Sequence, residues 1–231
     1  MPDAPRTHIA FLLFPGITPL DLVGPAQVLS RLPNVKIDLV ARTMAPARTD
    51  AHFSLPPTAV FADVPRADIL CVPGGFGVVE AMEDAETLAW LRQIAAEAIW
   101  VTSVCTGSLL LAAAGLLTGY RSACHWASRE QLSYFGVEPV AKRVVFDRNR
   151  VSGGGVTAGI DFALALVAAI AGEEHAKLVQ LSLEYDPHPP FDSGSPERAD
   201  PATLAKYQAM VEKFAPGRAE KVRAIAERLA M

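Results

Sequence analysis

Residues 103–119 have the sequence SVCTGSLLLAAAGLLTG, which places a cysteine between a β-branched run and a segment rich in alanine and leucine. The run before it, IWVTSV (99–104), has the composition of a buried strand. The segment after it, TGSLLLAAAG (106–115), predicts a helix that ends at Gly115. The stretch therefore predicts a strand and a helix joined by a tight turn at Cys105.

The same alternation of apolar strands and helices continues on both sides of this unit. Further strands are predicted at 8–14 (HIAFLLF), 36–41 (KIDLVA) and 68–75 (DILCVPGG). Further helices are predicted at 16–32, 83–98, 157–172 and 173–185. This alternation indicates an α/β fold, with a doubly wound, mostly parallel sheet of flavodoxin-like type and helices on both faces. In such sheets, ligand sites lie at the carboxyl ends of the strands, where the loop before Asp21, Gly74-Gly75 and Cys105 are all expected.

Two regions carry more specific expectations. Thr18 is predicted to cap the first helix with Pro19 in its first position, and Gly24-Pro25 to break or kink it early. The later part of the chain is predicted to contain, in order, a hairpin over 143–155 with an Arg-Asn turn, a Pro-, Ser- and Gly-rich loop over 186–201, and a charged helix over about 202–229 that breaks near Pro216-Gly217.

The composition indicates a protein with one sizeable core and no polyanionic partner. Of the 231 residues, 51% are hydrophobic and 20% are charged, and the net charge is −4 with no basic block, so nucleic acid is not expected as a partner. No signal peptide is expected, because the N-terminal apolar run, 9–14, is too short and no small-residue cleavage site follows it. No membrane span is expected, because the longest later apolar run, 162–171, is far too short. Three cysteines argue against a disulfide framework and predict a reducing, cytoplasmic location.

Cys105 is the strongest candidate for a catalytic residue. Ser103 and Gly107, two positions to either side, are small, as a strained turn from strand to helix requires. The free N–H groups and partial positive charge at the start of the helix are expected to lower the thiol pKa. The alternative is a buried structural cysteine, the role assigned to Cys71, inside an apolar strand, and to Cys124, which has no such turn around it.

Asp21 has two possible roles, and its spacing does not decide between them. It stands three residues after Thr18, where an acidic residue commonly caps or stabilises the start of a helix. It is also flanked by Leu20 and Leu22, and an apolar niche would raise its pKa and allow it to carry a proton.

Several other residues have a structural explanation beside a functional one. Gly74-Gly75 is either a plain turn or a source of backbone N–H groups that stabilise charge on a bound substrate. Thr106 is either a threonine that starts a helix or a second donor of this kind. His125, next to Trp126, is either a base or a hydrogen-bonded structural histidine. Gly153-Gly154-Gly155 lacks the lysine of a phosphate loop and follows no expected buried parallel strand, so it predicts close backbone approach. No metal-ligand spacing is apparent.

Four segments carry a family resemblance. They are FLLFPGITPLDLVGP (11–25), CVPGGFG (71–77), VTSVCTGSLLLAAAGLLTG (101–119) followed by His125-Trp126, and SGGGVTAGIDFALALV (152–167). Together they resemble the PfpI-like superfamily, which has a class I glutamine-amidotransferase-like fold. Within it the chain is most similar to the isocyanide hydratase subgroup, through VQLSLEYDPHPPFDSGSP (179–196). We expect a single domain over 1–231, with a core of about 8–190 that carries the resemblance and a helical C-terminal extension of about 200–231.

The resemblance implies both a reaction and a set of residues. Cys105 would be the nucleophile, Asp21 its acidic partner and Thr106 the residue beside the thiol, with backbone N–H groups of the Gly75-Phe76 turn nearby. Water would add to an organic isocyanide, giving an N-substituted formamide through a covalent cysteine thioimidate. The family resemblance also implies a homodimer that needs no metal or organic cofactor.

Departures from the family pattern narrow these expectations. Ser103 stands where many members have glycine, and Phe76 where a small polar residue is expected, which affects the shape of the pocket. Thr106 differs from the histidine of the related proteases, and Asp21 from the glutamate of deglycase-like members. Regulators with the same Cys-Thr-Gly turn add a helix-turn-helix module, for which the helical tail is expected to be too short and too weakly basic. A binding or redox-sensing domain without turnover is therefore the alternative.

Overall fold

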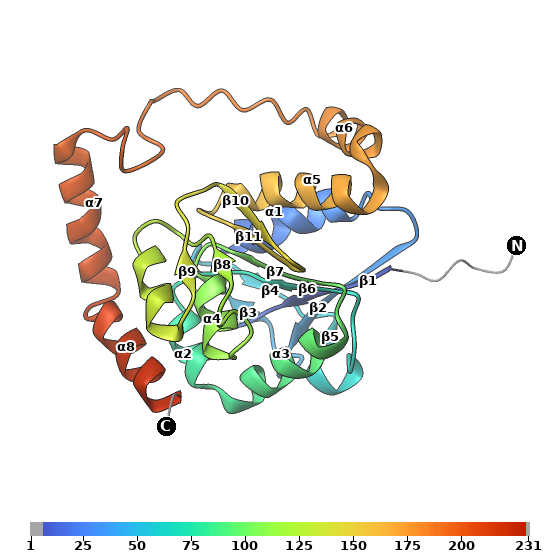
Figure 1. Cartoon of the computed structure of the whole chain (residues 1–231), viewed down its shortest axis with the longest axis horizontal. Coiled ribbons are helices and arrows are strands. Elements are labelled where there is room, and N and C mark those ends of the chain that lie inside the picture. The colour runs from blue at the N-terminus through green and yellow to red at the C-terminus, as the bar shows by residue number, and fades with distance from the viewer. Residues whose placement is uncertain (1–6, 230–231) are drawn as a thin grey trace, which may run out of the picture.

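A seven-stranded sheet forms the centre of the protein in the computed structural model, which describes residues 7–229 (Figure 1). In order across the sheet, the strands are β10 (Val144–Asp147), β11 (Arg150–Gly153), β7 (Trp100–Val104), β6 (Ile69–Val72), β1 (Thr7–Leu12), β2 (Val35–Ala41) and β5 (Ala59–Val60). All neighbours pair in parallel except β10, which pairs antiparallel with β11. The mostly parallel sheet predicted from the sequence is confirmed.

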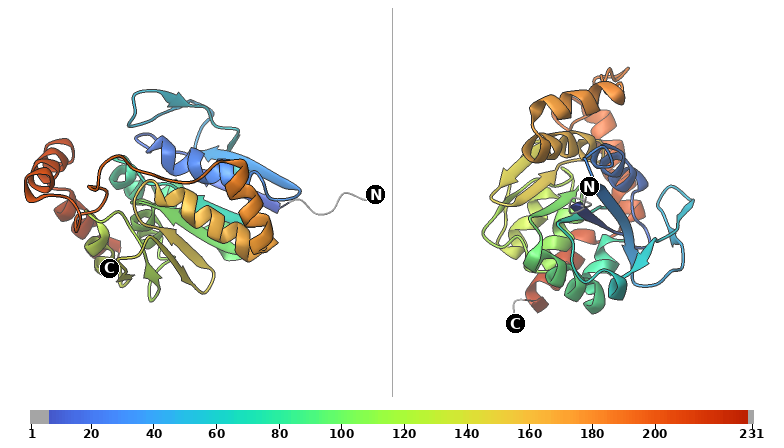
Figure 2. Two further views of the ribbon diagram at one scale, coloured as in Figure 1. Left: turned by 90° about the horizontal axis from the view of Figure 1, so that it is seen from above. Right: turned by 90° about the vertical axis from the view of Figure 1, so that its right-hand side faces the viewer.

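Helices cover both faces of this sheet (Figures 1 and 2). One layer contains α1 (Pro19–Leu29), α5 (Ala158–Ala171) and α6 (Glu173–Ser182), which pack on one another. The other contains α2 (Val78–Glu83), α3 (Ala85–Glu97) and α4 (Gly107–Ala113). Residues 9–12 of β1 are buried on both sides, which explains why this part of the strand is apolar.

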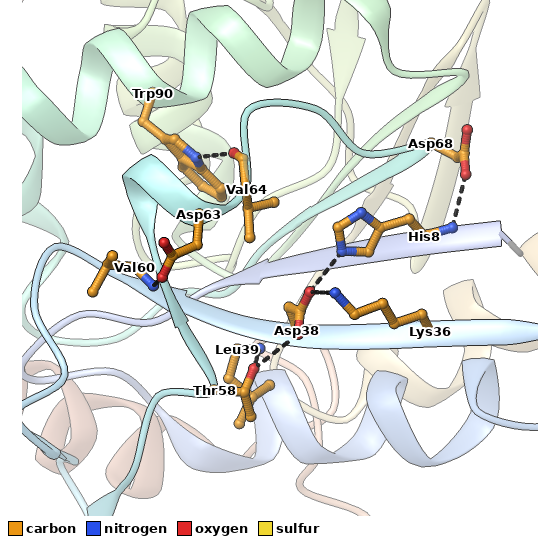
Figure 3. A network of polar contacts seen from close by, with 10 residues as sticks. All are labelled: His8, Lys36, Asp38, Leu39, Thr58, Val60, Asp63, Val64, Asp68 and Trp90. Carbon is orange, nitrogen blue, oxygen red and sulfur yellow. Dashed lines mark hydrogen bonds and ion pairs between the residues drawn. The ribbon is translucent and has the colours of Figure 1, made fainter.

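A polar network around Asp38 joins β1 to β2 (Figure 3). Asp38 Oδ2 lies 2.8 Å from His8 Nε2 and 2.6 Å from Lys36 Nζ, and Thr58 Oγ1 donates to Oδ1 at 3.2 Å. Burial alone would raise the pKa of Asp38, but the hydrogen bonds from Lys36, His8 and Thr58 outweigh it and lower the pKa. The partners of Asp38 therefore compensate its buried negative charge. The network lies toward the start of β1, away from the carboxyl end of that strand.

The first helix corrects one expectation and refines another. The predicted break at Gly24-Pro25 is wrong, because α1 continues through Pro25 to Leu29. Pro25 packs against Gly159 on α5, so contact between the two helices stabilises the segment despite the missing proline N–H. Thr18 and Pro19 occupy the predicted positions, but Thr18 makes no side-chain cap; its hydroxyl donates to Asp50 instead.

The later part of the chain agrees with the sequence-based expectations. The hairpin turns at Arg148-Asn149, with Arg148 at a φ of 54°. Gly115 follows α4 with a φ of 77°, as a helix-ending glycine does. Residues 183–200 have no helix or strand, and the charged tail divides into α7 (Pro201–Phe214) and α8 (Arg218–Leu229), which break where predicted.

Several short elements were not predicted. They are β3 (Ala47–Arg48), β4 (Ser54–Leu55), the 3₁₀ helices η1 (Phe61–Asp63) and η2 (Arg129–Phe135), α2, β5, β8 (Arg121–Ser122) and β9 (Glu138–Pro139). Most of them have only two or three residues, too few to leave a periodic pattern in a sequence, and α2 and η2 are also short, with six and seven residues. Within residues 7–229, no helix is both long and apolar enough to span a bilayer.

The loops after β1 and β6 lock together at the carboxyl edge of the sheet. Ile17 and Gly75 form an isolated antiparallel bridge, and the Thr18 N–H donates to the Gly74 carbonyl at 3.0 Å. Gly75 has a φ of 143°, and a Cβ atom there would overlap the carbonyl oxygen of Gly16. The position therefore requires glycine for both conformation and space.

Replacing this glycine should destabilise the whole fold. We expect Gly75→Ala to lower the free energy of unfolding by at least about 3 kcal/mol, because positive-φ strain and the backbone overlap add together. Urea unfolding measures the effect. Gly194→Ala is the matched control, since Gly194 has no positive φ and no atom within 4 Å of its Cβ position. Equal midpoints for both variants would contradict the prediction.

Candidate active site

The carboxyl ends of four neighbouring strands meet at one edge of the sheet. β11, β7, β6 and β1 are parallel and adjacent, so the segments that follow them lie together. These segments contain Gly154-Gly155, Cys105, Gly74-Gly75 and the loop leading to Asp21. The prediction that β11 is not a parallel strand is wrong: β11 pairs with β7, and its glycines stand beside the site.

Cys105 occupies a strained turn between β7 and α4. Its φ is 57°, in the left-handed region that non-glycine residues rarely adopt, and the residue is 5% exposed. Its N–H donates to the Gly153 carbonyl at 3.1 Å, which ties the turn to β11. A Cβ atom on Gly107 would overlap the Val72 carbonyl, so the small residue there is required. The predicted strained turn is confirmed.

Asp21 lies inside the protein rather than at the surface of α1. It is 0% exposed, and its Oδ2 accepts the Gly74 N–H at 2.9 Å. Its Oδ1 is also buried and accepts no hydrogen bond of regular geometry from the described residues. The Cys105 thiol lies close enough to this carboxyl group to hydrogen-bond with it. The capping role is therefore wrong, and the apolar-niche alternative describes Asp21.

Burial makes Asp21 a weak acid. Desolvation raises its pKa to about 7, against the lowering effects of the hydrogen bonds from Gly74 and Cys105, and the charge of Asp50 raises it further. Near neutral pH this group can therefore both accept and donate a proton. A carboxyl group tuned in this way has the properties of a general acid and base.

The thiol of Cys105 is also held in its protonated form. Burial and the nearby charge of Asp21 raise its pKa well above the usual value, although the Thr106 N–H and the charge of Arg218 act in the opposite direction. The prediction of a lowered thiol pKa is therefore wrong. The helix that follows, α4, has only seven residues, and its weak positive end does not compensate for burial.

The pair consequently shares one proton near neutral pH. Cys105 holds it in the resting state because its pKa lies above that of Asp21. Any reaction that uses the sulfur as a nucleophile must move this proton, and the carboxylate of Asp21 is the neighbouring acceptor.

The remaining predicted residues surround this pair. Thr106 Oγ1 accepts the Gly75 N–H at 3.0 Å and donates to the Gly75 carbonyl at 3.3 Å. That N–H is therefore engaged with Thr106 rather than free to contact a ligand. Phe76 is 47% exposed and lies near Phe214 of α7, with ring centroids 6.4 Å apart. The Phe76 side chain thus forms part of the cavity wall, and the contact predicted for its backbone N–H stays a prediction.

A cavity of about 230 Å³ opens above the thiol. Its lining residues are Thr18, Asp50, Gly75, Phe76, Cys105, Thr106, His125, Ala127, Ser128, Val156, Tyr207, Val211 and Arg218. The volume fits a small organic molecule. Among the described residues, no group of three or more His, Cys, Asp or Glu side chains is arranged to hold a metal ion.

His125 lies in the cavity wall and not on the thiol. Its ring packs between Trp126 and Tyr207, and its Nδ1 accepts the Ala127 N–H at 3.3 Å. Burial and the charge of Arg218 lower its pKa. No hydrogen bond joins His125 to Cys105 within residues 7–229, so a Cys-His pair is not formed.

Sequence reasoning missed three ionisable residues that line this cavity: Asp50, Tyr207 and Arg218. Tyr207 and Arg218 come from α7 and α8, and Asp50 from the connection between β3 and β4. They stand more than 50 residues from Cys105 in the sequence or outside any recognisable motif. The return of the C-terminal helices to this edge brings in Tyr207 and Arg218 (Figure 2), and the connection between β3 and β4 brings in Asp50.

The other two cysteines are buried within the protein core. Burial raises the pKa of Cys71 and of Cys124 to about 12. Cys71 accepts a hydrogen bond from Thr102 Oγ1 at 3.1 Å. These properties fit the structural roles predicted for both residues.

Comparison with known proteins places the chain in a family. Residues 7–169 match the model of the DJ-1/PfpI family. The chain is similar to isonitrile hydratase of Pseudomonas putida, with 53% identity over 197 residues that cover 85% of this chain and 86% of the relative. It is also similar in structure to a THiJ/PfpI family protein of Pseudomonas syringae, with a TM-score of 0.91, 42% identity and coverage of 97% and 92% of the two chains.

A more distant relative represents the regulators considered above. The transcriptional regulator CdhR of Pseudomonas aeruginosa is 29% identical over 182 residues, which cover 76% of this chain and 53% of the regulator. The greater identity and coverage of the hydratase agree with the predicted subgroup.

The raised pKa of Asp21 predicts a pH-dependent cost to stability. Because the folded protein retains this proton up to about pH 7, its stability falls as pH rises from about 4 to 7, by about 4 kcal/mol through this group. The amide that Asp21→Asn introduces cannot ionise. We therefore expect the variant to gain stability over the natural protein by a few kcal/mol more at pH 8 than at pH 5.

Urea unfolding of both proteins at the two pH values measures this difference. Glu212→Gln, which removes an exposed carboxylate on α7, serves as the control and should change little. A difference between Asp21→Asn and the natural protein that does not vary with pH would show that Asp21 ionises normally.

Proposed function

The chain belongs to the DJ-1/PfpI family, and we propose that within it this protein is an isocyanide hydratase. It adds water to an organic isocyanide and releases the N-substituted formamide. Identity to a curated isonitrile hydratase, the same activity under another name, supports the reaction. The observation that carries the proposal is the buried Cys105–Asp21 pair, in which the thiol lies within hydrogen-bonding reach of the carboxyl group and Cys105 lines a small cavity.

In the first step, the sulfur of Cys105 attacks the terminal carbon of the isocyanide while its proton passes to Asp21. The isocyanide carbon has no leaving group, so it must receive a proton as the carbon–sulfur bond forms. Asp21 delivers the proton it has just accepted, and the product is a thioimidate, Cys105–S–CH=N–R. Oδ1 is the oxygen suited to this transfer, because Oδ2 already accepts the Gly74 N–H.

In the second step, Asp21 is a carboxylate again and acts on water. Water adds to the thioimidate carbon, and its proton passes through Asp21 to the imine nitrogen. The carbon–sulfur bond then breaks as the new hydroxyl gives up its proton, which restores the one-proton pair and releases the formamide. A carboxyl group with a pKa of about 7 serves both steps, so His125 is not required as a base.

The remaining predicted residues support this pair. The Thr106 N–H approaches the sulfur and favours its charged form, while the Thr106 hydroxyl secures the Gly75 backbone. Phe76 limits the size of the substituent that the cavity accepts. The Gly75 N–H, which Thr106 accepts, is therefore given a structural role, and the backbone contact predicted for Phe76 stays a prediction.

The sensing alternative is less well supported by the site. A redox-sensing cysteine requires an exposed thiol of lowered pKa. Cys105 is 5% exposed, and its pKa is raised. The buried acid beside it has no function in simple oxidation, whereas hydration requires it.

The proposal includes the expected cellular setting. The three cysteines of the protein are free, which suits a reducing compartment, and we place the enzyme in the cytoplasm. The family resemblance implies a homodimer. Leu20 and Val23 on α1 are 39% and 44% exposed, so this helix offers an apolar surface to a second copy.

Turnover of an aryl isocyanide tests the reaction and the nucleophile together. With para-nitrophenyl isocyanide, the natural protein should form the formamide, which absorbance follows. Cys105→Ala should lower the rate by at least about 10³-fold to the background, because no covalent intermediate can form. Unchanged circular dichroism should exclude unfolding. Comparable rates in both proteins would end the claim that Cys105 is the nucleophile.

Asp21→Asn separates the acid from the thiol in the same assay. The variant should retain a thiol that iodoacetamide alkylates, yet it should not turn over isocyanide, because no group moves the proton. Full activity would mean that Asp21 only stabilises the loop through Gly74.

The pH profile of kcat/KM reports the shared proton. Below about pH 7, Asp21 is protonated and cannot accept the proton of the thiol, so kcat/KM should fall about tenfold per pH unit. Above that value the profile should level off, because the pair then holds one proton. Steady-state rates between pH 5 and 9 measure this, and a profile with no inflection between pH 6 and 8 would contradict it.

A further inference from the structure

Two fixed charges of opposite sign line the cavity, and the steps above do not use them. Among the described residues that line it, Arg218 is the one with a permanent positive charge, and Asp50 is the one carboxylate. Arg218 is the first residue of α8, whereas Asp50 lies between β3 and β4. Both therefore reach the site from segments outside the loops that hold Cys105 and Asp21.

The guanidinium of Arg218 is partly buried, and one edge of it lacks hydrogen-bond partners. Its Nε and Nη2 atoms are shielded from solvent and have no hydrogen-bond acceptor among the described residues. These two donors form one edge of the guanidinium, the edge that usually binds a carboxylate. An unpaired buried cation is costly. Its field is also weakly screened, so it acts strongly on nearby groups.

The field of Arg218 acts on the sulfur side of the cavity. Its charge lowers the pKa of Cys105, Cys124 and His125. The arginine therefore favours negative charge on the sulfur.

Asp50 acts on the other member of the pair, Asp21. Thr18 Oγ1, at the start of α1, donates to Asp50 Oδ2 at 2.5 Å, and the Asp50 N–H donates to the Ile17 carbonyl at 3.0 Å. These bonds hold the carboxylate near the first turn of α1, which carries Asp21. The charge of Asp50 raises the pKa of Asp21 and so favours its protonated form.

We propose that Arg218 and Asp50 are positioning residues that polarise the Cys105–Asp21 pair and draw its shared proton from the sulfur to the carboxylate. The resulting form, a thiolate beside a carboxylic acid, is the one that attacks the isocyanide. The consequence for hydration depends on the proposed function, whereas the polarisation of the pair does not.

The other titratable or charged groups near the pair are either neutral near pH 7 or outside the cavity lining. Titratable or charged groups near Arg218 and the pair are Cys124, His125, Arg129, Tyr207 and Glu80. His125 has a lowered pKa, Tyr207 a raised one and Cys124 a strongly raised one, so all three are neutral near pH 7. Arg129 affects Cys124 and Glu80 affects Arg218, but neither lines the cavity.

Alkylation of Cys105 by iodoacetamide tests the proposal without any isocyanide. In the natural protein, the rate should rise from pH 6 to a plateau that begins near pH 7, where Asp21 ionises. Quantification of the alkylated Cys105 peptide by mass spectrometry separates it from Cys71 and Cys124. Cys105→Ala gives the background.

The two variants should have different pH signatures. Arg218→Met should lower the rate about threefold to tenfold at both pH 6 and pH 8 and leave the inflection in place, because the arginine acts on the sulfur. Asp50→Asn keeps the acceptor for Thr18. It should leave the rate at pH 6 unchanged, lower the plateau at pH 8 and move the inflection to lower pH, because the aspartate acts on Asp21.

Matched variants separate charge from shape. Arg218→Lys retains the positive charge and should restore most of the rate. Arg223→Met removes another arginine of α8, one that contacts Tyr134 outside the cavity, and should change nothing. The double variant, Arg218→Met with Asp50→Asn, should show at pH 8 the product of the two single effects.

Three outcomes would overturn the proposal: an unchanged rate in Arg218→Met, equal losses in Arg218→Met and Arg218→Lys, or an unchanged plateau in Asp50→Asn.

Hydration rates provide the second readout, and kcat/KM for the isocyanide should change among the variants as the alkylation rates do. If the natural protein does not hydrate isocyanides but the alkylation signatures appear, the polarisation stands and the proposed function fails.

Discussion

The hydrogen bond from the Gly74 N–H to Asp21 Oδ2 is the interaction around which the site is organised. It holds a carboxylate in the protein interior, at the point where the loops after β1 and β6 meet. The conformation of Gly75 makes that meeting possible, since any side chain there would strike the neighbouring loop. Because Oδ2 is occupied in this way, Oδ1 is the oxygen that remains for proton exchange beside Cys105.

Burial of two acids side by side opposes stability and creates reactivity. Desolvation raises the pKa of both Asp21 and Cys105, so the folded protein carries a cost that an exposed pair would avoid. The same cost leaves one proton shared between them near neutral pH. An isocyanide takes up a nucleophile and a proton at one carbon. A thiol and a carboxyl group that share one proton can supply both.

The C-terminal helices complete the cavity rather than merely extending the chain. The family match ends at residue 169, yet Tyr207, Val211 and Arg218 line the space above the thiol. The α8 helix buries Val222, Ile225 and Ala226, so apolar packing fixes its position. The part of the protein beyond the shared core therefore supplies both a wall of the pocket and the cation that faces the sulfur.

The sequence alone determined the parallel sheet and the turn at Cys105, and it singled out Cys105 as the candidate nucleophile. These follow from local patterns: apolar runs of strand length, small residues around the cysteine and glycines at the strand ends. It could not determine that Thr18 bonds Asp50 instead of capping its helix, that Pro25 lies within α1, or that the Cys105 pKa is raised. Each depends on which distant groups surround a residue and how much water they exclude. Desolvation and long-range charge are properties of the assembled tertiary structure, so only the fold decided how the pair holds its proton.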